Sequence, residues 1–472
     1  MKRVKVIIKA ILSIFGILVF YIIIGMVTTS FRMPTISSEN LKGIQEIVDG
    51  NNHYPHSVKL IDDPEAALQE RIHLIAQSKS SVNMVYYKVT GGDAADLIFA
   101  ELVEAAERGV TINMILDDKV GGYNGSNQAN FELLASYDTV NLYGYNPINF
   151  LKPSSWNSVF HNKFINVDHT MTILGGRNIG DNYYNPQGYT GSITHDLDVM
   201  VKNDTYVNSL SESTQNVMDE LITAPYVNQK TMGKPTDTAR KRLKNIRQAY
   251  LDLNPHVYDV EQELPGTYTE VDHLQLVNQP FVNTVKEPII GTLLQQLALN
   301  AQNRIVIQTP YATGNQHFLD AFQNAQERNV EVSYVSNSLY SSPNYPAYSN
   351  YHAHRKQLLE INVHIYEYFN PNRASLHGKA YLFDSNTVVL GSFNLDDRSL
   401  YQNTESVVYI RSEAFNQVVQ TSIEGKEDFL KTVDEKGTPT DPLVHQTLKV
   451  PLYKKCLMWI ISLFSRSFQP LV

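Results

Sequence analysis

The feature that most constrains the fold is a group of polar residues that the chain carries twice at one spacing. The first set is His161, Lys163, Asp168, Gly175 and Asn178, and the second is His377, Lys379, Asp384, Gly391 and Asn394. Each residue of the second set follows its counterpart by 216 positions, on a strand–turn–strand pattern. Five matches at one offset do not arise by chance. Because 472 residues are also too many for one ordinary core, the chain is predicted to contain two copies of one folding unit.

Strands alternate with amphipathic helical patterns in both halves, which predicts an α/β fold. In the first half the predicted strands are 81–87, 110–118 and 139–146, with helices at 95–109 and near 127–137. In the second half they are 304–312, 330–338 and 362–370, with helices near 316–328 and 348–361. We expect two similar lobes, 55–225 and 267–435, each a mixed sheet flanked by helices, sharing one active site. The polar segment 226–266 is predicted to connect them.

The duplicated residues suit chemistry on a phosphodiester. Residues two apart on a strand face the same side, so the histidine and lysine of each set are expected to point together. A neutral imidazole can attack phosphorus, and a second, protonated imidazole can donate a proton to the departing alkoxide. The lysines and the amides of Asn178 and Asn394 would stabilise the developing phosphoryl charge without a metal. This predicts phosphodiester exchange through a covalent phosphohistidine.

Other candidate features receive a structural interpretation. Asp117–Asp118 is expected to cap a strand end, and Tyr86–Tyr87 and Tyr183–Tyr184 are expected to pack. The single cysteine, Cys456, excludes a disulfide scaffold and a cysteine-based zinc site. Histidines and carboxylates do not cluster at metal-ligand spacing, and no glycine-rich nucleotide loop has the right context, so neither a metal nor a cofactor is expected.

The N-terminal segment has the length of a membrane anchor. Residues 10–31 carry no charge and would form a helix of roughly 33 Å, enough to cross a hydrocarbon core of about 30 Å. A cleaved signal peptide is the alternative, but the apolar run is long and no A-x-A-like site follows. Residues 1–32 are therefore predicted to anchor the protein in the cell membrane with a single pass. Four preceding cations place the N-terminus in the cytoplasm and the body outside.

The C-terminal segment 449–472 is predicted to be an amphipathic helix that lies in the bilayer interface. Lys454 and Lys455 begin a basic strip opposite a broad apolar face that includes Trp459. A helix that closes over a protein core would show the same periodicity. Apart from the two basic ends, residues 10–445 carry a net charge of −17, which argues against a nucleic-acid partner.

The motif H-x-K-x4-D followed by G-G/S-x-N, present twice, resembles the phospholipase D superfamily, and the resemblance runs from about residue 57 to 430. GGRNIGDNYY and LGSFNLDDRSLYQNTE are similar to segments of its bacterial cardiolipin synthases. The resemblance implies three catalytic residues from each motif: His161, Lys163, Asp168, His377, Lys379 and Asp384. The acid after each motif, which orients the histidine, maps onto Glu405 and onto Asp196, with Asp198 as a rival. The commoner assignment in two-motif relatives makes His161 the nucleophile, although symmetry alone would allow His377.

These observations predict a membrane phosphatidyltransferase that makes cardiolipin from phosphatidylglycerol and a second phospholipid, with phosphatidylethanolamine as a further candidate. The lipid substrate follows from the resemblance and from the membrane-facing ends. A phospholipase D hydrolase that releases phosphatidic acid would use the same residues with water. A nuclease is disfavoured by the acidic body, and a non-catalytic lipid-binding scaffold by the presence of both histidines and both lysines.

Overall fold

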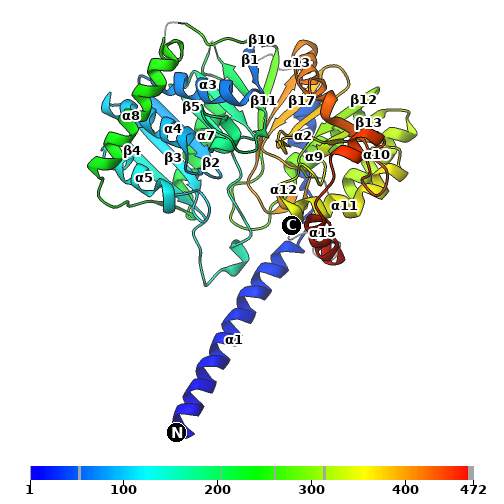
Figure 1. Ribbon diagram of the computed structural model, residues 1–472, viewed down its shortest axis with the longest axis horizontal. Helices are drawn as coiled ribbons and strands as arrows, with labels where there is room; N and C mark the ends of the chain where they lie inside the picture. The colour runs from blue at the N-terminus through cyan, green and yellow to red at the C-terminus, as the bar shows by residue number, and fades with distance from the viewer. Residues whose placement is uncertain (1, 51–54, 204, 260–261, 312–314, 466–472) are drawn as a thin grey trace.

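The computed structural model describes residues 2–50, 55–203, 205–259, 262–311 and 315–465 and consists of two lobes side by side (Figure 1). The sheet of the first lobe has the order β10 (Thr269–Val271), β1 (His56–Ile61), β8 (Asp198–Lys202), β6 (Met171–Gly175), β5 (Phe164–Val167), β2 (Ser81–Tyr86), β3 (Thr111–Asp117), β4 (Val140–Tyr145) and β9 (Val227–Gln229). The sheet of the second lobe has the order β11 (His273–Asn278), β18 (Ser406–Arg411), β17 (Thr387–Gly391), β16 (Ala380–Phe383), β12 (Arg304–Gln308), β13 (Glu331–Asn337), β14 (His364–Tyr368) and β19 (Leu430–Thr432).

The two sheets have the same topology. From β1 to β9 and from β11 to β19 the strands correspond one to one, and β10 is an extra edge strand. In each sheet three neighbouring strands run parallel, β2–β3–β4 and β12–β13–β14, while the other pairings are antiparallel. The hairpins β5–β6 and β16–β17 carry the duplicated motifs and match residue for residue at the offset of 216. The predicted two-lobed mixed α/β architecture is confirmed.

Helices flank both sheets, and the main helices lie close to where periodicity predicted them. The first lobe contains α3 (Pro64–Ala76), α4 (Asp93–Glu107), α5 (Gln128–Leu134), α6 (Asp181–Tyr184), α7 (Leu210–Thr223) and α8 (Asp237–Leu253). The second lobe carries α2 (Ser38–Asp49), α9 (Ile289–Asn300), α10 (Gln316–Glu327), α11 (Tyr345–Glu360), α12 (Asp397–Tyr401), α13 (Glu413–Glu424), α14 (Pro442–Thr447) and α15 (Leu452–Ser465). Their starts follow ordinary capping rules: the Asp63 side chain, for example, accepts the Ala66 N–H at the start of α3.

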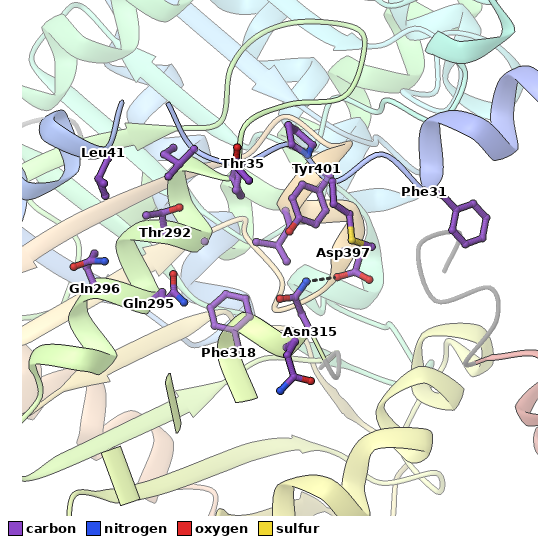
Figure 2. A pocket seen from close by; sticks show the side chains of 17 residues that line it. Phe31, Thr35, Leu41, Thr292, Gln295, Gln296, Asn315, Phe318, Asp397 and Tyr401 are labelled. Atoms are coloured by element: carbon purple, nitrogen blue, oxygen red, sulfur yellow. Dashed lines mark hydrogen bonds between the residues drawn. The ribbon is translucent and has the colours of Figure 1, made fainter. Parts of the chain in front are cut away.

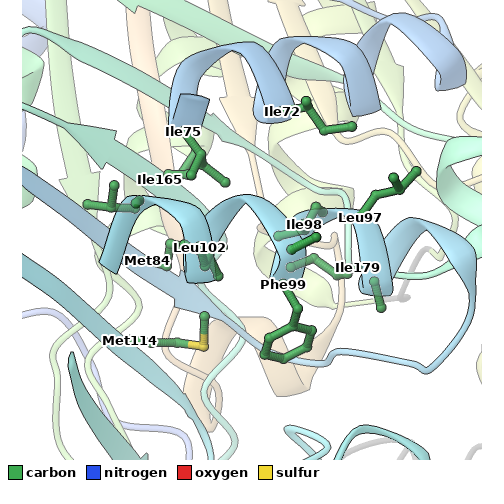
Figure 3. Close-up of a cluster of buried hydrophobic side chains, with 14 of the residues drawn as sticks. Ile72, Ile75, Met84, Leu97, Ile98, Phe99, Leu102, Met114, Ile165 and Ile179 are labelled. Atoms are coloured by element: carbon green, nitrogen blue, oxygen red, sulfur yellow. The ribbon is translucent and has the colours of Figure 1, made fainter. Parts of the chain in front are cut away.

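Strand alternation divides the apolar core into an outer part for each lobe and a shared part between the lobes. In β2, Val82 and Met84 face the outer core under α3 and α4 (Figure 3), whereas Val85 faces the other way. Val85 joins side chains of the second sheet, including Val306 and Leu382, in the shared core. Burying both faces of both sheets explains why these strands read as nearly continuous apolar runs. It also fixes the two lobes against each other.

The segment 226–266 differs from the predicted connection because it belongs to the first lobe. β9 pairs with β4, and α8 packs on α4. The polar face of α8 explains the composition that suggested a linker: Arg247 forms an ion pair with Glu101 of α4 at 2.8 Å. β10 also pairs with β1 of the first sheet, so the chain passes between the lobes at Asp272, five residues beyond the predicted boundary at 267.

The N-terminal helix α1 (Lys2–Ser30) projects away from both lobes (Figure 1). Within it, Ile7–Ser30 is long and apolar enough to cross a membrane, and most of its side chains are exposed, although Thr29 and Ser30 at its end are buried. This supports membrane anchoring by a single helix. After α1 the chain runs along the second lobe, where residues such as Phe31 and Thr35 line a cavity of about 600 Å³ with Thr292 and Tyr401 (Figure 2). Helix α2 then buries Ile44 in the core of that lobe.

Helix α15 packs on α11, and this contact changes the predicted orientation of its basic strip. Lys454 is buried, and its Nζ donates to the Tyr340 carbonyl at 3.2 Å and lies over the Tyr345 ring. Met458 is buried against the second lobe, while Trp459 is 66% exposed. The cause is local: a lysine ammonium can satisfy free carbonyls of a neighbouring loop. The part of the predicted strip from 466 onward lies outside the described residues.

Candidate active site

Each motif histidine lies immediately after a backbone contact between the lobes. Phe160 forms an isolated bridge with Thr404, and the His161 N–H donates to the Thr404 carbonyl at 3.1 Å. In the same way, β15 (Ser375–Leu376) pairs with β7 (Thr194–His195), and the His377 N–H donates to the His195 carbonyl at 2.6 Å. Both histidines therefore lie where the lobes meet. The two duplicated motifs form one buried site rather than two separate sites.

The carboxylate that holds each imidazole comes from the opposite lobe. Nδ1 of His161 lies 2.8 Å from Oε2 of Glu405, and Nδ1 of His377 lies 2.5 Å from Oδ2 of Asp196. Asp198, the rival to Asp196, instead accepts from Arg71 and Arg177 inside the first lobe. The acid that follows each motif thus holds the histidine of the other motif through Nδ1, so Nε2 is the ring nitrogen without a carboxylate partner; Nε2 of His377 lies 3.2 Å from Nζ of Lys379.

The close approach of the lobes explains a glycine of the first motif. Gly176 lies beside the carboxylate of Asp196: a Cβ at this position would be 2.3 Å from Oδ1 of Asp196 and 3.2 Å from Cδ of Lys379. Any side chain here would displace the carboxylate that holds His377. Gly176, two residues before Asn178, is therefore required for this contact.

The motif lysines are fully buried beside their histidines. Lys163 donates to the backbone carbonyl of His161, and Lys379 donates to that of His377 at 2.5 Å. Nζ of Lys379 also lies 2.7 Å from Nδ1 of His377. Burial lowers the pKa of both lysines, while Glu405 raises that of Lys163 and Asp196 raises that of Lys379. Two buried lysines at the meeting point of the lobes are suited to contact an anionic group.

Electrostatics distinguish the two histidine–carboxylate pairs. Burial lowers the pKa of His377 to about 4, and burial together with Lys163 and Lys379 holds the pKa of His161 well below its usual value. Burial would raise the pKa of Asp196, but Lys379 and His377 keep it well below its usual range. For Glu405 burial dominates and raises the pKa to about 7, although Lys163 opposes it. Ionised Asp196 therefore supports a positive imidazolium at His377 better than Glu405 does at His161.

The motif asparagines are placed to donate to a bound anion. Asn178 and Asn394 are both buried, just after β6 and β17. Oδ1 of each lacks a hydrogen-bond partner within the described part of the chain. Nδ2 of Asn178 makes a long contact of 3.3 Å with the Tyr183 hydroxyl. Because Oδ1 is an acceptor, a donor group of a ligand would complete it, whereas an anion would be bound by Nδ2 of these amides.

The structure does not bring Asp168 and Asp384 to the histidines. Both lie at the hairpin turns and have positive φ. The four-residue strands β5 and β16, each about 13 Å long, separate them from the His-x-Lys end of their motif. Asp168 accepts the backbone N–H groups of residues 79–81, and Asp384 those of residues 302–304. This placement corrects the predicted catalytic role: these carboxylates fix the start of β2 and β12 against the motif hairpin.

Three residues of the site were not identified from the sequence. The rings of Tyr87 and His161 meet edge-on at 5.1 Å, and those of Tyr183 and His377 at 5.5 Å, so these tyrosines line the site as well as pack. Arg398 lies near His161 and lowers its pKa. The available signal was positional, because Tyr87 lies at the end of the predicted strand 81–87, and strand ends line sites in such sheets. Arg398 corresponds to Asn182 at the offset of 216, so the two halves of the site are not equivalent.

Asp117 caps the end of β3, as expected, and also holds a residue next to His161. Its carboxylate accepts the N–H groups of Lys119 and Val120 at 2.9 and 3.1 Å, which turns the chain after β3. The other oxygen accepts the Phe160 N–H at 2.9 Å. The strand end thereby fixes the residue that precedes His161.

The arrangement is suited to in-line exchange at one phosphorus atom. It offers two imidazoles oriented by carboxylates, two buried lysines and two amides around one space. In the part of the chain that the structure describes, His, Cys, Asp and Glu side chains do not gather in groups of three that could hold a metal ion. Charge on the phosphoryl oxygens would thus be balanced by Lys163, Lys379 and the two asparagines.

Comparison with known proteins identifies the family. The family model described as "Cardiolipin synthase, PLD-like domain" matches residues 71–218 and 293–426. The chain is 25% identical over 399 residues to cardiolipin synthase C of Escherichia coli K12, covering 75% of this chain and 81% of the relative. It is 27% identical over 421 residues to an uncharacterized protein of Helicobacter pylori strain 26695, covering 80% of each chain.

The fold has a counterpart among solved structures. The crystal structure of phosphatidylserine synthase from Haemophilus influenzae Rd KW20 superposes with a TM-score of 0.63 at 15% identity, covering 91% of this chain and 98% of the other. Both lobes and their arrangement are therefore shared. Together with the duplicated motif and its two histidines at one site, the family match shows that the chain belongs to the cardiolipin synthase family with phospholipase D-like domains.

Proposed function

We propose that the protein is a membrane phosphatidyltransferase that makes cardiolipin from phosphatidylglycerol and a second phospholipid. The observation that carries the proposal is the pair of buried imidazoles, each held by a carboxylate of the opposite lobe, next to two lysines. Two imidazoles at one phosphate allow nucleophile and general acid to act on opposite sides of phosphorus. The lipid substrate is supported by the family and by the apolar N-terminal helix.

In the first step, Nε2 of His161 attacks the phosphorus of phosphatidylglycerol. A P–N bond forms while the bond from phosphorus to the glycerol oxygen breaks, and His377 donates its proton to that oxygen. Ionised Asp196 supports the imidazolium at His377 that this step requires, which favours His377 as the acid and His161 as the nucleophile. Free glycerol leaves, and the phosphatidyl group remains on His161.

In the second step the roles of His377 and of the alcohol are reversed. The hydroxyl of a second phosphatidylglycerol gives its proton to His377 and attacks phosphorus. The P–N bond breaks, which regenerates neutral His161 and yields cardiolipin. Lys163, Lys379, Asn178 and Asn394 balance the charge on the phosphoryl oxygens in both steps. Phosphatidylethanolamine would enter instead in the first step as the phosphatidyl donor: the bond from phosphorus to the ethanolamine oxygen breaks, His377 donates its proton to that oxygen, and the second step with phosphatidylglycerol is unchanged.

The proposal is tested by mass analysis of lipids after the purified protein is incubated with phosphatidylglycerol vesicles. Cardiolipin together with stoichiometric free glycerol is the expected result. Phosphatidic acid without cardiolipin would show a hydrolase instead. Unchanged lipid, from a protein whose thermal unfolding shows it to be folded, would contradict both enzymatic assignments. The His161→Asn variant is the control for lipid changes caused by a contaminant.

A further inference from the structure

A loop that leads directly into His161 lies against the apolar helix α1. Residues 147–157 leave the end of β4 and extend below the lobes beside the upper part of α1 (Figure 1). The Tyr21 hydroxyl donates to the Leu151 carbonyl at 2.9 Å, and Nδ2 of Asn157 donates to the Met26 carbonyl at 2.8 Å. At Gly25 a Cβ would lie 2.6 Å from Cγ of Pro153, so only glycine allows this approach. The loop is therefore seated on the candidate membrane span.

The position of these contacts places the loop tip below the membrane surface. Tyr21 precedes the end of the candidate span at Ser30 by nine residues, or about 14 Å along the helix axis. The headgroup layer of one leaflet is only about 5–8 Å thick. Even if Ser30 lay at the outer edge of that layer, the contact between Tyr21 and Leu151 would be within the hydrocarbon region. An aqueous position for the loop tip is incompatible with a membrane-spanning α1.

The side chains of the loop suit that environment. Ile148, Phe150 and Leu151 are 53%, 61% and 84% exposed, which is unusual for three large apolar residues within four positions. Trp156 packs edge-on against Phe150 at 5.3 Å, and its amphipathic ring is typical of the membrane interface. Lys152 is the one charged residue of 147–157, and its long side chain can reach the headgroups.

Part of the loop backbone is also hydrogen-bonded within the loop, which lowers the cost of an apolar solvent. The side-chain oxygen of Asn149 accepts the Leu151 N–H at 2.9 Å. The backbone carbonyl of Asn149 accepts the Lys152 N–H at 3.0 Å and the Trp156 Nε1–H at 2.8 Å. The N–H groups of Ser155 and Trp156 donate to carbonyls within the short 3-10 turn. Pro147 and Pro153 have no N–H to satisfy.

We propose that residues 147–157 form a membrane-inserted loop, a second bilayer contact that packs on α1 and ends four residues before His161. Its occupant is the lipid leaflet adjoining the catalytic body, because the loop is continuous with the candidate membrane span. In terms of the proposed function, on which this consequence rests, the loop brings the phosphate of a leaflet phospholipid toward the nucleophile without extraction of the whole lipid. Arg398, whose Nη2 lies 3.3 Å from the Asn157 carbonyl, stands between the loop and His161.

The insertion can be measured with one fluorophore per molecule. Cys456 is replaced by serine in the full-length protein, and Leu151→Cys or, as a second probe, Phe150→Cys is labelled with a nitrobenzoxadiazole dye. The matched control is Leu253→Cys on α8, which is 60% exposed and lies away from α1 (Figure 1). Each labelled protein is reconstituted in phosphatidylcholine–phosphatidylglycerol vesicles. Quenching is then compared for spin labels on the acyl chains, spin labels on the headgroup and aqueous iodide.

Insertion predicts that acyl-chain spin labels quench the dye at 151 and 150 at least threefold more strongly than the dye at 253, and that iodide quenches only the control. Iodide quenching at 151 and 150 equal to that at 253 would overturn the proposal. So would quenching by headgroup labels alone, which would place the loop on the bilayer surface. Because the readout does not require turnover, a protein that inserts the loop but makes no cardiolipin would contradict the proposed function and leave the insertion intact.

Discussion

At the scale of single residues, each histidine of the site is held by a carboxylate that comes from the other lobe. Glu405 follows the second motif but holds His161, and Asp196 follows the first motif but holds His377. Loss of either carboxylate should therefore affect the step carried out by the opposite motif. This gives a direct way to distinguish the nucleophile from the general acid.

We predict opposite effects for Glu405→Gln and Asp196→Asn with a phosphatidyl ester of p-nitrophenol, whose leaving group needs no acid. Glu405→Gln should slow the burst of p-nitrophenolate by about 10²-fold or more, because His161 loses its orienting acceptor. Asp196→Asn should leave that burst within a few-fold of the wild type while slowing turnover of phosphatidylglycerol by about 10²-fold. The reverse pattern would mean that His377 is the nucleophile.

The pH dependence of the same burst follows from Glu405. Burial raises its pKa to about 7, so below this pH the carboxyl binds a proton and no longer accepts from Nδ1 of His161. The burst rate should therefore fall as the pH drops through about 7. In Glu405→Gln the burst rate should be lower at every pH but should not fall near pH 7, because the titrating group is absent. In Asp196→Asn the fall near pH 7 should remain. A wild-type rate that is constant from pH 5.5 to 8 would contradict the assignment.

The site residues that could be identified from the sequence are those that belong to the duplicated His-x-Lys pattern. Two His-x-Lys pairs at one offset mark the histidines and lysines that the two lobes bring together, without knowledge of the fold. Asp196 and Asp198 could not be separated, because residues two apart share a strand face and only the approach of the other lobe distinguishes them. Tyr87 and Arg398 were not identified because their roles depend on tertiary contacts: Tyr87 meets His161 within the first lobe, and Arg398 approaches His161 from the second lobe.

At the scale of elements, each motif hairpin is held by its aspartate turn. Equal spacing identified Asp168 and Asp384 as equivalent, but spacing cannot show that a four-residue strand separates them from the histidines. A similar limit applies to α8, whose charged residues suggested a linker although they pair with the helix beneath it. Sequence patterns located the helices and strands of both lobes well, and failed where polar residues find partners in other elements.

We predict that Asp168→Asn lowers stability and leaves the chemistry largely intact. Its carboxylate accepts three backbone N–H groups, and hydrogen bonds to a charged acceptor contribute roughly 1.5–3 kcal/mol. Thermal unfolding should therefore shift to lower temperature, while turnover of the folded protein stays within about threefold of the wild type. A 100-fold loss of turnover with an unchanged unfolding temperature would place Asp168 in the reaction itself.

At the scale of the whole molecule, three apolar features lie on one side of the body: α1, the tip of loop 147–157 and helix α15 (Figure 1). The exposed Trp459 and Leu151 belong to two of them. This distribution would set the body flat on the membrane with the interlobe site close to the lipid headgroups. It is consistent with a substrate whose phosphate lies at the bilayer surface.

The four cations that precede the span predict the orientation of this assembly. Lys2, Arg3, Lys5 and Lys9 should hold the N-terminus in the cytoplasm, which leaves the catalytic body outside the cell membrane. Protease added to intact protoplasts should then digest the body, and a cytoplasmic marker protein should survive as the control. A fully protected body, digested only after lysis, would place the active site in the cytoplasm.

The central claim is that a phosphatidyl group passes through His161 while His377 handles the proton. The most direct test is to mix the His377→Asn variant with the p-nitrophenyl phosphatidyl ester, digest it at neutral or mildly alkaline pH, and map the adduct by mass spectrometry. The account predicts a phosphatidyl group on the peptide that contains His161, and none when His161→Asn is treated in the same way. An adduct on His377 of the wild-type protein, or release of p-nitrophenolate with no adduct on either histidine, would contradict it.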